Sequence, residues 1–142
     1  MIFSRGCEYA VRAMLHLATT REDGPLLVRD IARDLDVPFP FLAKIVQQLA
    51  RQGLVNSQKG RGGGVQLARN AGAISLLEVV EAIDGLDLTR RCLLGLPDCS
   101  DDAPCHLHGH WASIRAEIVT MLEGQTLADF THGDGKGCQV QP

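Results

Sequence analysis

Residues 28–67 read VRDIARDLDVPFPFLAKIVQQLARQGLVNSQKGRGGGVQL. Apolar side chains recur at helical spacing from Val28 to Leu35 and again from Leu42 to Leu49, and a proline-containing turn separates the two runs. Two short apolar segments then flank a glycine-rich stretch, which is typical of a β-hairpin. This order predicts a mainly α-helical winged helix-turn-helix with a two-stranded wing.

The sequence on either side of this segment predicts three further helices. Helical spacing of apolar residues predicts one helix over residues 4–19. Ser75 and Glu78 match a capping box, which predicts the start of a helix that runs to about Ile83. A third apolar stripe predicts a long C-terminal helix over residues 110–130, which would bury its apolar face most easily against a second subunit.

Length and composition bound the organisation of the chain. With 142 residues, 45% of them hydrophobic and 4% aromatic, the chain suits one helical core with an attached arm. We expect no membrane span and no export leader, and therefore a cytoplasmic protein. The expected segments are a winged-helix DNA-binding domain (1–84), a cysteine-rich cluster-binding loop (85–109), a dimerisation helix (110–130) and a disordered tail (131–142).

Charge is unevenly distributed along the chain. Residues 37–77 hold five of the 14 basic residues and none of the 17 acidic ones, so this segment carries +5 and the remainder −8. Such a local excess is typical of a DNA-binding element in an otherwise acidic protein. The alternative is chance clustering on one solvated face.

Five residues are candidates for contact with DNA. The outer face of the second helix of the pair carries Lys44, Gln47 and Gln48, whose side chains can bond base edges or phosphates. Lys59 and Arg61 lie at the tip of the predicted hairpin, where a wing reaches the DNA backbone or the minor groove. Polar outer faces also occur on any small helical bundle. The glycines lack the Gly-Lys-Ser/Thr ending of a nucleotide-binding loop.

A second candidate site is the cysteine-rich loop. Cys92, Cys99, Cys105 and His108 fall within 17 positions. Thiolates on a flexible loop can converge on an iron–sulfur cluster, which also accepts histidine as a ligand. Zinc and unmetallated thiols are the alternatives, although the close Cys-x2–4-Cys spacing of structural zinc sites is absent from the sequence.

The remaining cysteines and histidines receive structural interpretations. Cys7 is expected to be a small buried apolar residue of the first helix. Cys138 falls in the predicted tail. We expect His106 and His110 to face solvent rather than to bind metal.

The chain resembles a known family through several blocks of sequence. They read EYAVRAM at 8–14, FLAKI at 41–45, GLV at 53–55, GRGGGV at 60–65, ISLLEVVEAI at 74–83 and CHLH at 105–108. Over roughly residues 1–130 the chain is similar to the Rrf2 family of bacterial transcription regulators. It departs from relatives at the start of the recognition helix, where Pro38-Phe39-Pro40-Phe41 replaces a polar serine and a basic residue.

The resemblance implies a homodimer that pairs through its C-terminal helix and binds a roughly palindromic operator in double-stranded DNA. It also implies one iron–sulfur cluster per subunit, [2Fe–2S] or [4Fe–4S]. Cys92, Cys99 and Cys105 would be the thiolate ligands, with His108 as the fourth ligand or, alternatively, Glu8 of the partner subunit. We expect His108 to be the ligand.

The functional expectation is a DNA-binding transcription regulator, a repressor, that senses iron–sulfur status, nitric oxide or redox state. The alternative on the same fold is a cluster-free regulator whose switch is cysteine thiols, zinc or a small ligand. An enzyme is not expected, because the sequence has no nucleophile and base at telling spacing and no pocket signature.

Overall fold

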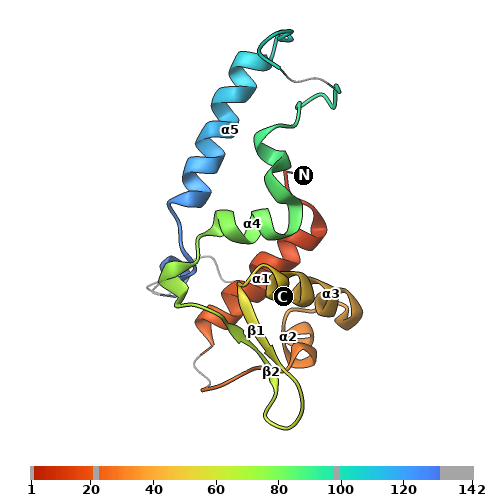
Figure 1. The fold of residues 1–142 in the computed structure, drawn as a ribbon, viewed down its shortest axis with the longest axis vertical. Helices are drawn as coiled ribbons and strands as arrows, with labels where there is room; N and C mark the ends of the chain where they lie inside the picture. Colours follow the sequence, from red (N-terminus) through yellow and green to blue (C-terminus); the bar gives the residue numbers. More distant parts are fainter. Residues whose placement is uncertain (1, 21–22, 98–99, 132–142) are drawn as a thin grey trace.

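The computed structural model describes residues 2–20, 23–97 and 100–131. A helical core carries a hairpin at one end, and one long helix rises from the other side of the core (Figure 1). The elements in chain order are α1 (Arg5–Thr19), α2 (Val28–Asp34), α3 (Phe39–Arg51), β1 (Val55–Gln58), β2 (Gly64–Leu67), η1 (Ala71–Ala73), α4 (Leu76–Asp84), η2 (Gly85–Thr89), α5 (His108–Glu123) and η3 (Leu127–Phe130).

The core forms where α1, α2 and α3 pack together. The helix predicted over residues 4–19 is confirmed, and α1 begins after Ser4, whose hydroxyl accepts a hydrogen bond of 3.1 Å from the backbone N–H of Cys7. Aliphatic side chains fill the interior, as the low aromatic content predicted. The largest fully enclosed side chains are Met14, Ile31, Leu42, Leu49, Ile74 and Leu127.

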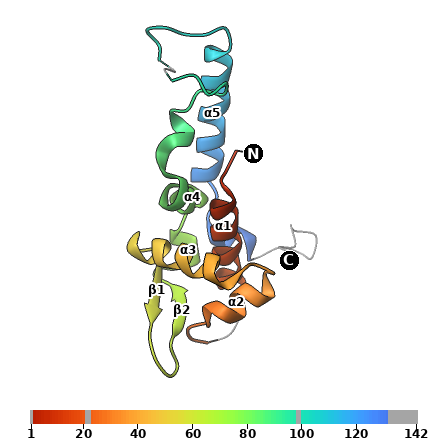
Figure 2. The same ribbon diagram turned by 90° about the vertical axis from the view of Figure 1, so that its right-hand side faces the viewer.

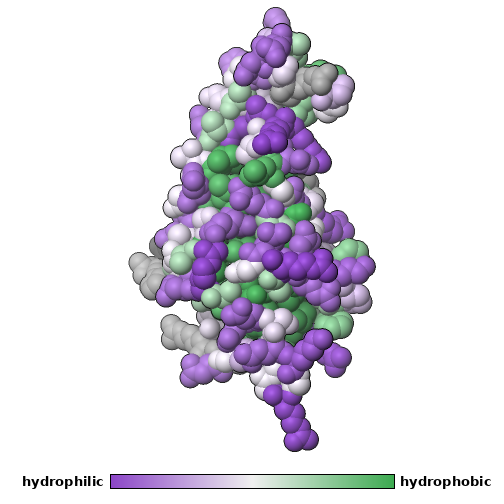
Figure 3. Space-filling view, in the orientation of Figure 1, coloured by the Kyte–Doolittle hydropathy of each residue, from purple (hydrophilic) through white to green (hydrophobic). Residues whose placement is uncertain are grey.

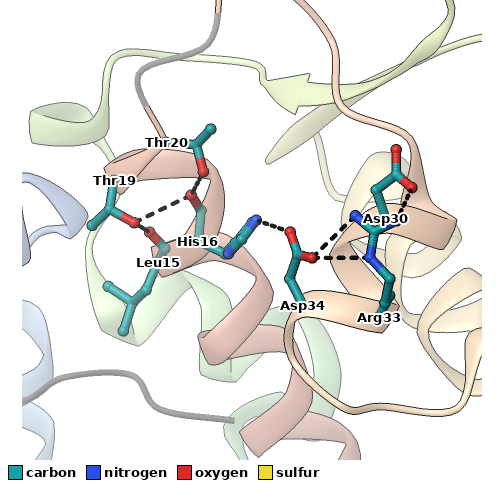
Figure 4. Close-up of polar contacts among 7 residues, drawn as sticks. All are labelled: Leu15, His16, Thr19, Thr20, Asp30, Arg33 and Asp34. Carbon is teal, nitrogen blue, oxygen red and sulfur yellow. Dashed lines mark hydrogen bonds and ion pairs between the residues drawn. The ribbon is translucent and has the colours of Figure 1, made fainter.

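The predicted helix-turn-helix is confirmed. The turn after α2 passes through Asp36, which adopts a left-handed φ of 52°, and the N–H of Val37 bonds back to the carbonyl of Ala32 at 2.9 Å. Pro38 is the N-cap residue of α3, and this helix begins at Phe39 with Pro40 in its first turn. His16 of α1 also approaches α2, since its ring Nε2 lies 3.7 Å from the Asp34 carboxylate (Figure 4).

The two-stranded wing is confirmed as well. β1 and β2 pair antiparallel, with Val55 opposite Leu67. Leu26, which precedes α2, exchanges backbone hydrogen bonds of 2.9 and 2.7 Å with Val65, and this fixes the base of the wing to the helical core. Gly64 has a φ of 139°, and a Cβ at this position would lie 2.4 Å from the carbonyl oxygen of Leu26. Only glycine fits there, so the wing is anchored by close backbone approach.

The capping box at the start of α4 has both of its hydrogen bonds. The Ser75 hydroxyl accepts from the N–H of Glu78, and the Glu78 carboxylate accepts from the N–H of Ser75 at 2.9 Å. The other end of α4 joins α1, because the Asp84 carboxylate accepts hydrogen bonds from the backbone N–H and the hydroxyl of Ser4. These hydrogen bonds therefore fix the position of α4 relative to α1.

The C-terminal helix differs in extent from the helix expected over residues 110–130. α5 begins two residues earlier, at His108, and ends at Glu123. The chain then turns at Gly124 and re-enters the core through η3, where Leu127 is fully buried. A capping box between Thr126 and Asp129 stabilises the start of η3. Burial of one leucine against the core therefore ends the long helix about two turns earlier than the expected range.

The apolar stripe of α5 is partly buried in the subunit and partly exposed on its surface. Leu122 is 5% exposed and packs in a small second cluster with Cys7 and Val80, so part of the apolar face expected at a second subunit is buried within this one. Ile114 and Met121, by contrast, are exposed, Met121 to 59%. No helix of the described residues is long and apolar enough to cross a membrane.

Candidate nucleic-acid interface and cysteine loop

The exposed face of α3 carries a stripe of polar side chains. The opposite side of the helix is buried in the core, which leaves Lys44, Gln47 and Arg51 in solvent. These residues recur every three to four positions and therefore lie along one side of the helix. Arg51 was not among the five predicted contacts, although the same spacing could have found it.

Gln48 lies outside this stripe. Its side-chain N–H donates a hydrogen bond of 2.9 Å to the backbone carbonyl of Ala82 on α4. The side chain is partly buried between the two helices. Gln48 thus fixes the orientation of α3 relative to α4, whereas the DNA-reading role expected from the sequence needs an outward amide.

The two wing residues project from the other side of the candidate interface. Lys59 and Arg61 are exposed in the loop between β1 and β2. Gly60 and Gly62 on either side of Arg61 adopt positive φ values of 89° and 71°, which lets the loop reverse direction tightly. Figure 3 shows the hydrophilic hairpin tip as the lower end of the molecule.

A hollow of about 370 Å³ lies between the wing, the start of α2 and the start of α3. Leu27, Arg29, Phe39 and the wing glycines line it. The guanidinium of Arg29 sits 5.7 Å from the centre of the Phe39 ring, within the range of a cation–π contact. Arg29 gave no signal in the sequence, because α2 contains two arginines and two aspartates and has no net charge.

The cysteine loop lies at the opposite end of the molecule from the wing. Figures 1 and 2 show the segment between η2 and α5 at the upper end and the hairpin at the lower end. Cys92 and Cys105 are both partly exposed, while Cys99 and Cys138 lie outside the described residues. Any signal received at this loop must therefore cross the body of the subunit to reach α3.

His108 is the first residue of α5 and is only 9% exposed. Its backbone N–H bonds to the carbonyl of Cys105 at 3.0 Å, so these two predicted ligands share one turn. Its ring Nε2 lies 2.9 Å from a carboxylate oxygen of Asp101. A carboxylate on one ring nitrogen is the usual second partner of a histidine that binds metal through the other. Sequence reasoning missed Asp101, because a single aspartate in a loop gives no signal.

The first turn of α5 also holds the start of the loop. The indole N–H of Trp111 donates to the carbonyl of Arg91 at 2.7 Å, and the Arg115 guanidinium donates to the same oxygen at 3.3 Å. Arg91 immediately precedes Cys92. Both ends of the loop are therefore attached to α5.

The structure confirms the expected burial of Cys7 and the expected exposure of His106 and His110. Cys7 is fully buried, and burial, together with the negative charges of Asp84 and Glu8, raises the pKa of its thiol to about 12. His106 and His110 are exposed.

The donor types of the loop fit an iron–sulfur cluster, since thiolates and an imidazole are its ligands. The described part of the chain contributes two of these thiols and the imidazole. Among the residues described, no three cysteine, histidine or acidic side chains form a group that could hold a metal ion. Glu8, the alternative fourth ligand, is exposed on α1.

Comparison with known proteins decides the family. The model of the family described as Rrf2, iron-dependent transcriptional regulator, matches residues 3–133. The chain belongs to the Rrf2 family. A helix-turn-helix transcriptional regulator of Aquifex aeolicus is 34% identical to it over 138 residues, covering 96% of this chain and 95% of the relative. The regulator IscR of Klebsiella pneumoniae is 32% identical over 124 residues, covering 87% and 76%.

The Rrf2 fold is also found among solved structures. CymR of B. subtilis, described as its global cysteine regulator, superposes with a TM-score of 0.78 at 24% identity, covering 91% of this chain and 95% of CymR. The winged helix-turn-helix predicted from sequence is thus the fold of the family. Rrf2 relatives are transcription regulators and not enzymes, as expected.

Proposed function

We propose that this Rrf2 protein is a cytoplasmic homodimeric repressor that senses its signal through an iron–sulfur cluster bound by Cys92, Cys99, Cys105 and His108. The observation that carries the proposal is the attachment of the loop to α5. The backbone N–H of His108, at the start of that helix, bonds to the carbonyl of Cys105, and the carbonyl next to Cys92 accepts two hydrogen bonds from the same helix. A change in the loop would therefore act directly on α5.

The exposed residues of α5 support pairing with a second copy of the chain. Ile114 and Met121 present apolar side chains to solvent and are not buried in the core of their own subunit. Apolar side chains gather between α5 and η2 in Figure 3. A symmetric contact through α5 would bury these side chains and would set two winged helices on a roughly palindromic operator.

A chain of contacts links the loop to the recognition helix. α5 packs on α4 through Leu122 and Val80. α4 in turn holds α3 through the hydrogen bond from Gln48 to Ala82. A tilt of α5 would thus move α4 and α3 together, and the two arrangements of the dimer would differ in their affinity for DNA.

The DNA contacts follow from the exposed cations and amides. Lys44 and Gln47 would reach base edges or phosphates in the major groove. Lys59 and Arg61 of the wing would contact the backbone or the minor groove beside it. Arg51 extends the stripe on α3 toward the phosphates, and Gln48 is left out of the interface.

The carboxylate of Asp101 supports His108 over Glu8 of the partner subunit as the fourth ligand. It would fix the ring and its tautomer while the other ring nitrogen bound iron. When bound, the cluster would supply a centre whose ligands exchange on oxidation or reaction with nitric oxide. [2Fe–2S] and [4Fe–4S] forms both suit three thiolates and one imidazole.

Anaerobic purification tests the proposal. Absorption spectra and iron and sulfide content per subunit are measured for the wild type, for Cys92→Ser and for the control Cys138→Ser, which changes a cysteine outside the proposed ligand set. We expect a coloured wild type and control with equal iron and sulfide, and a colourless Cys92→Ser. Equal iron in Cys92→Ser and the wild type would contradict the ligand assignment.

The alternative function is a regulator that uses its thiols directly. The observation that favours it is the partial exposure of Cys92 and Cys105. In that case the anaerobic protein would be colourless and free of iron, and mild oxidation would change its affinity for DNA. Stoichiometric zinc without sulfide would instead identify a zinc site.

A further inference from the structure

The first turn of α3 is apolar on its exposed surface. Phe39 is 43% exposed and Phe41 63% exposed, with Pro40 also exposed between them. These residues are two positions apart, so the two rings flank the helix start on opposite sides. None of the three side chains can donate or accept a hydrogen bond. Large exposed aromatic side chains gathered at one place are typical of an interaction surface.

Two cations flank this turn. Arg29 lies 5.7 Å from the centre of the Phe39 ring, and Lys44 follows Phe41 one turn later on the exposed side. Residues 37–77 contain no acidic side chain, and the exposed Asp36 comes just before them. A surface for a protein partner would need the apolar side chains but not the two cations. An apolar centre among cations matches the major groove of DNA, where apolar methyl groups lie between two rows of phosphates.

The proposed DNA-binding role narrows what this turn can recognise. The first residues of a recognition helix are the ones that contact base edges. In this helix they cannot form side-chain hydrogen bonds, so direct readout there is restricted to apolar contact. The one apolar group on the major-groove edge of the bases is the C5-methyl group of thymine.

We propose that Phe41 is a specificity-determining residue that reads thymine through its methyl group, with Pro40 as its apolar neighbour in the same turn. The inference rests on the proposed DNA-binding function. Polar readout would come later along the helix, from Lys44 and Gln47. The operator should therefore hold a thymine where the first turn of α3 enters each half-site.

The test removes only the methyl group. A duplex is selected by the wild-type protein from a randomised pool, and each thymidine is then replaced in turn by deoxyuridine, which keeps the base pair and the phosphates. We expect one or two positions per half-site at which the wild type loses about fourfold in affinity, the effect of one buried methyl group. Phe41→Ala should bind the thymidine and deoxyuridine duplexes equally well at those positions.

Two further variants separate this contact from general DNA affinity. Lys44→Ala should weaken binding to both duplexes and keep the fourfold ratio. Phe41→Leu retains an apolar side chain and should keep part of the ratio. Because Phe41 is exposed, its variants should melt at the wild-type temperature.

The remaining outcomes would overturn the inference. If the wild type binds every deoxyuridine duplex as tightly as its parent, or if Phe41→Ala retains the ratio, then Phe41 does not read thymine. A result of that kind leaves the DNA-binding function intact. Failure of the wild type to select any duplex would instead overturn the DNA-binding function itself.

Discussion

The indole N–H of Trp111 donates a 2.7 Å hydrogen bond to the carbonyl of Arg91, the residue before the first cysteine of the loop. Trp111 lies on the first turn of α5, and Arg115, one turn later, donates to the same oxygen at 3.3 Å. This carbonyl is therefore a fixed point between the cysteine loop and the helix that is proposed to pair two subunits. Loss of the hydrogen bonds to this carbonyl should therefore loosen the backbone at Cys92.

Trp111→Phe tests this attachment, because it keeps an aromatic ring and removes the N–H donor. Loss of one hydrogen bond is worth about 1 kcal/mol, so amide hydrogen exchange over residues 91–95 should rise about fivefold. The control is His110→Ala on the same turn, which is exposed and should leave exchange unchanged. Equal exchange in Trp111→Phe and the wild type would show that Trp111 does not hold the loop.

Gln47 and Gln48 are adjacent amides with different predicted roles. Gln48→Ala removes the hydrogen bond to Ala82 and should lower the free energy of unfolding by about 1 kcal/mol and the melting temperature by about 4 °C. Gln47→Ala should leave the melting temperature unchanged and weaken operator binding. Thermal melts and binding titrations of both variants check the assignment, and the reverse pattern would contradict it.

The wing should contribute through phosphate contacts. Arg61→Ala should weaken binding to all DNA sequences and lower the slope of log affinity against log salt by about 0.9 for each phosphate that Arg61 neutralises. Arg33→Ala is the matched control, because Arg33 is exposed but paired with Asp30 and Asp34, each at 3.2 Å (Figure 4). An unchanged slope in Arg61→Ala would mean that the wing tip does not touch the DNA.

Cys7 should react with alkylating reagents much more slowly than the loop thiols. Since burial raises its pKa to about 12, only about one thiol in ten thousand is ionised at pH 8. Iodoacetamide should therefore label Cys92 and Cys105 in the metal-free, reduced, folded protein and should label Cys7 only after denaturation. Peptide mass spectrometry gives the result, and rapid labelling of Cys7 in the folded protein would contradict its burial.

The same pKa predicts a dependence of stability on pH. The ordinary thiol pKa is near 9, so between pH 9 and pH 12 the folded state holds a proton at Cys7 that the unfolded state has lost. The contribution of Cys7 to stability should therefore be constant below pH 9 and fall as the pH rises above it. Denaturant unfolding at pH 7 to 10 should show a steeper fall for the wild type than for Cys7→Ala.

Local sequence signals were sufficient for most of the fold. The capping box at Ser75 and Glu78, the paired helical stripes and the glycine-rich hairpin each depend on neighbours within a few residues. Those signals place α3, the wing and α4 in the correct order along the chain. The exposed positions of Lys44 and Gln47 follow from the helical periodicity, and those of Lys59 and Arg61 follow from the glycine-rich turn of the hairpin.

Other features depend on which elements pack together, and sequence spacing does not determine this. Gln48 lies at the edge of the outer face of α3, and only the position of α4 turns its amide inward. Met121 and Leu122 are adjacent and both apolar, yet only Leu122 faces the subunit interior, because α5 packs on α4. The loop after η2 has no periodicity, so the pairing of His108 with Asp101 could not be predicted.

The most direct test of the central claim is the operator affinity of the anaerobically purified wild type compared with that of Cys92→Ser, measured by fluorescence anisotropy at one salt concentration. If the loop controls the recognition helices, the two proteins should differ in affinity by about 5- to 150-fold, the usual range for coupled sites. Cys138→Ser should match the wild type. Equal affinities for all three proteins would contradict the claim that the cysteine loop regulates DNA binding.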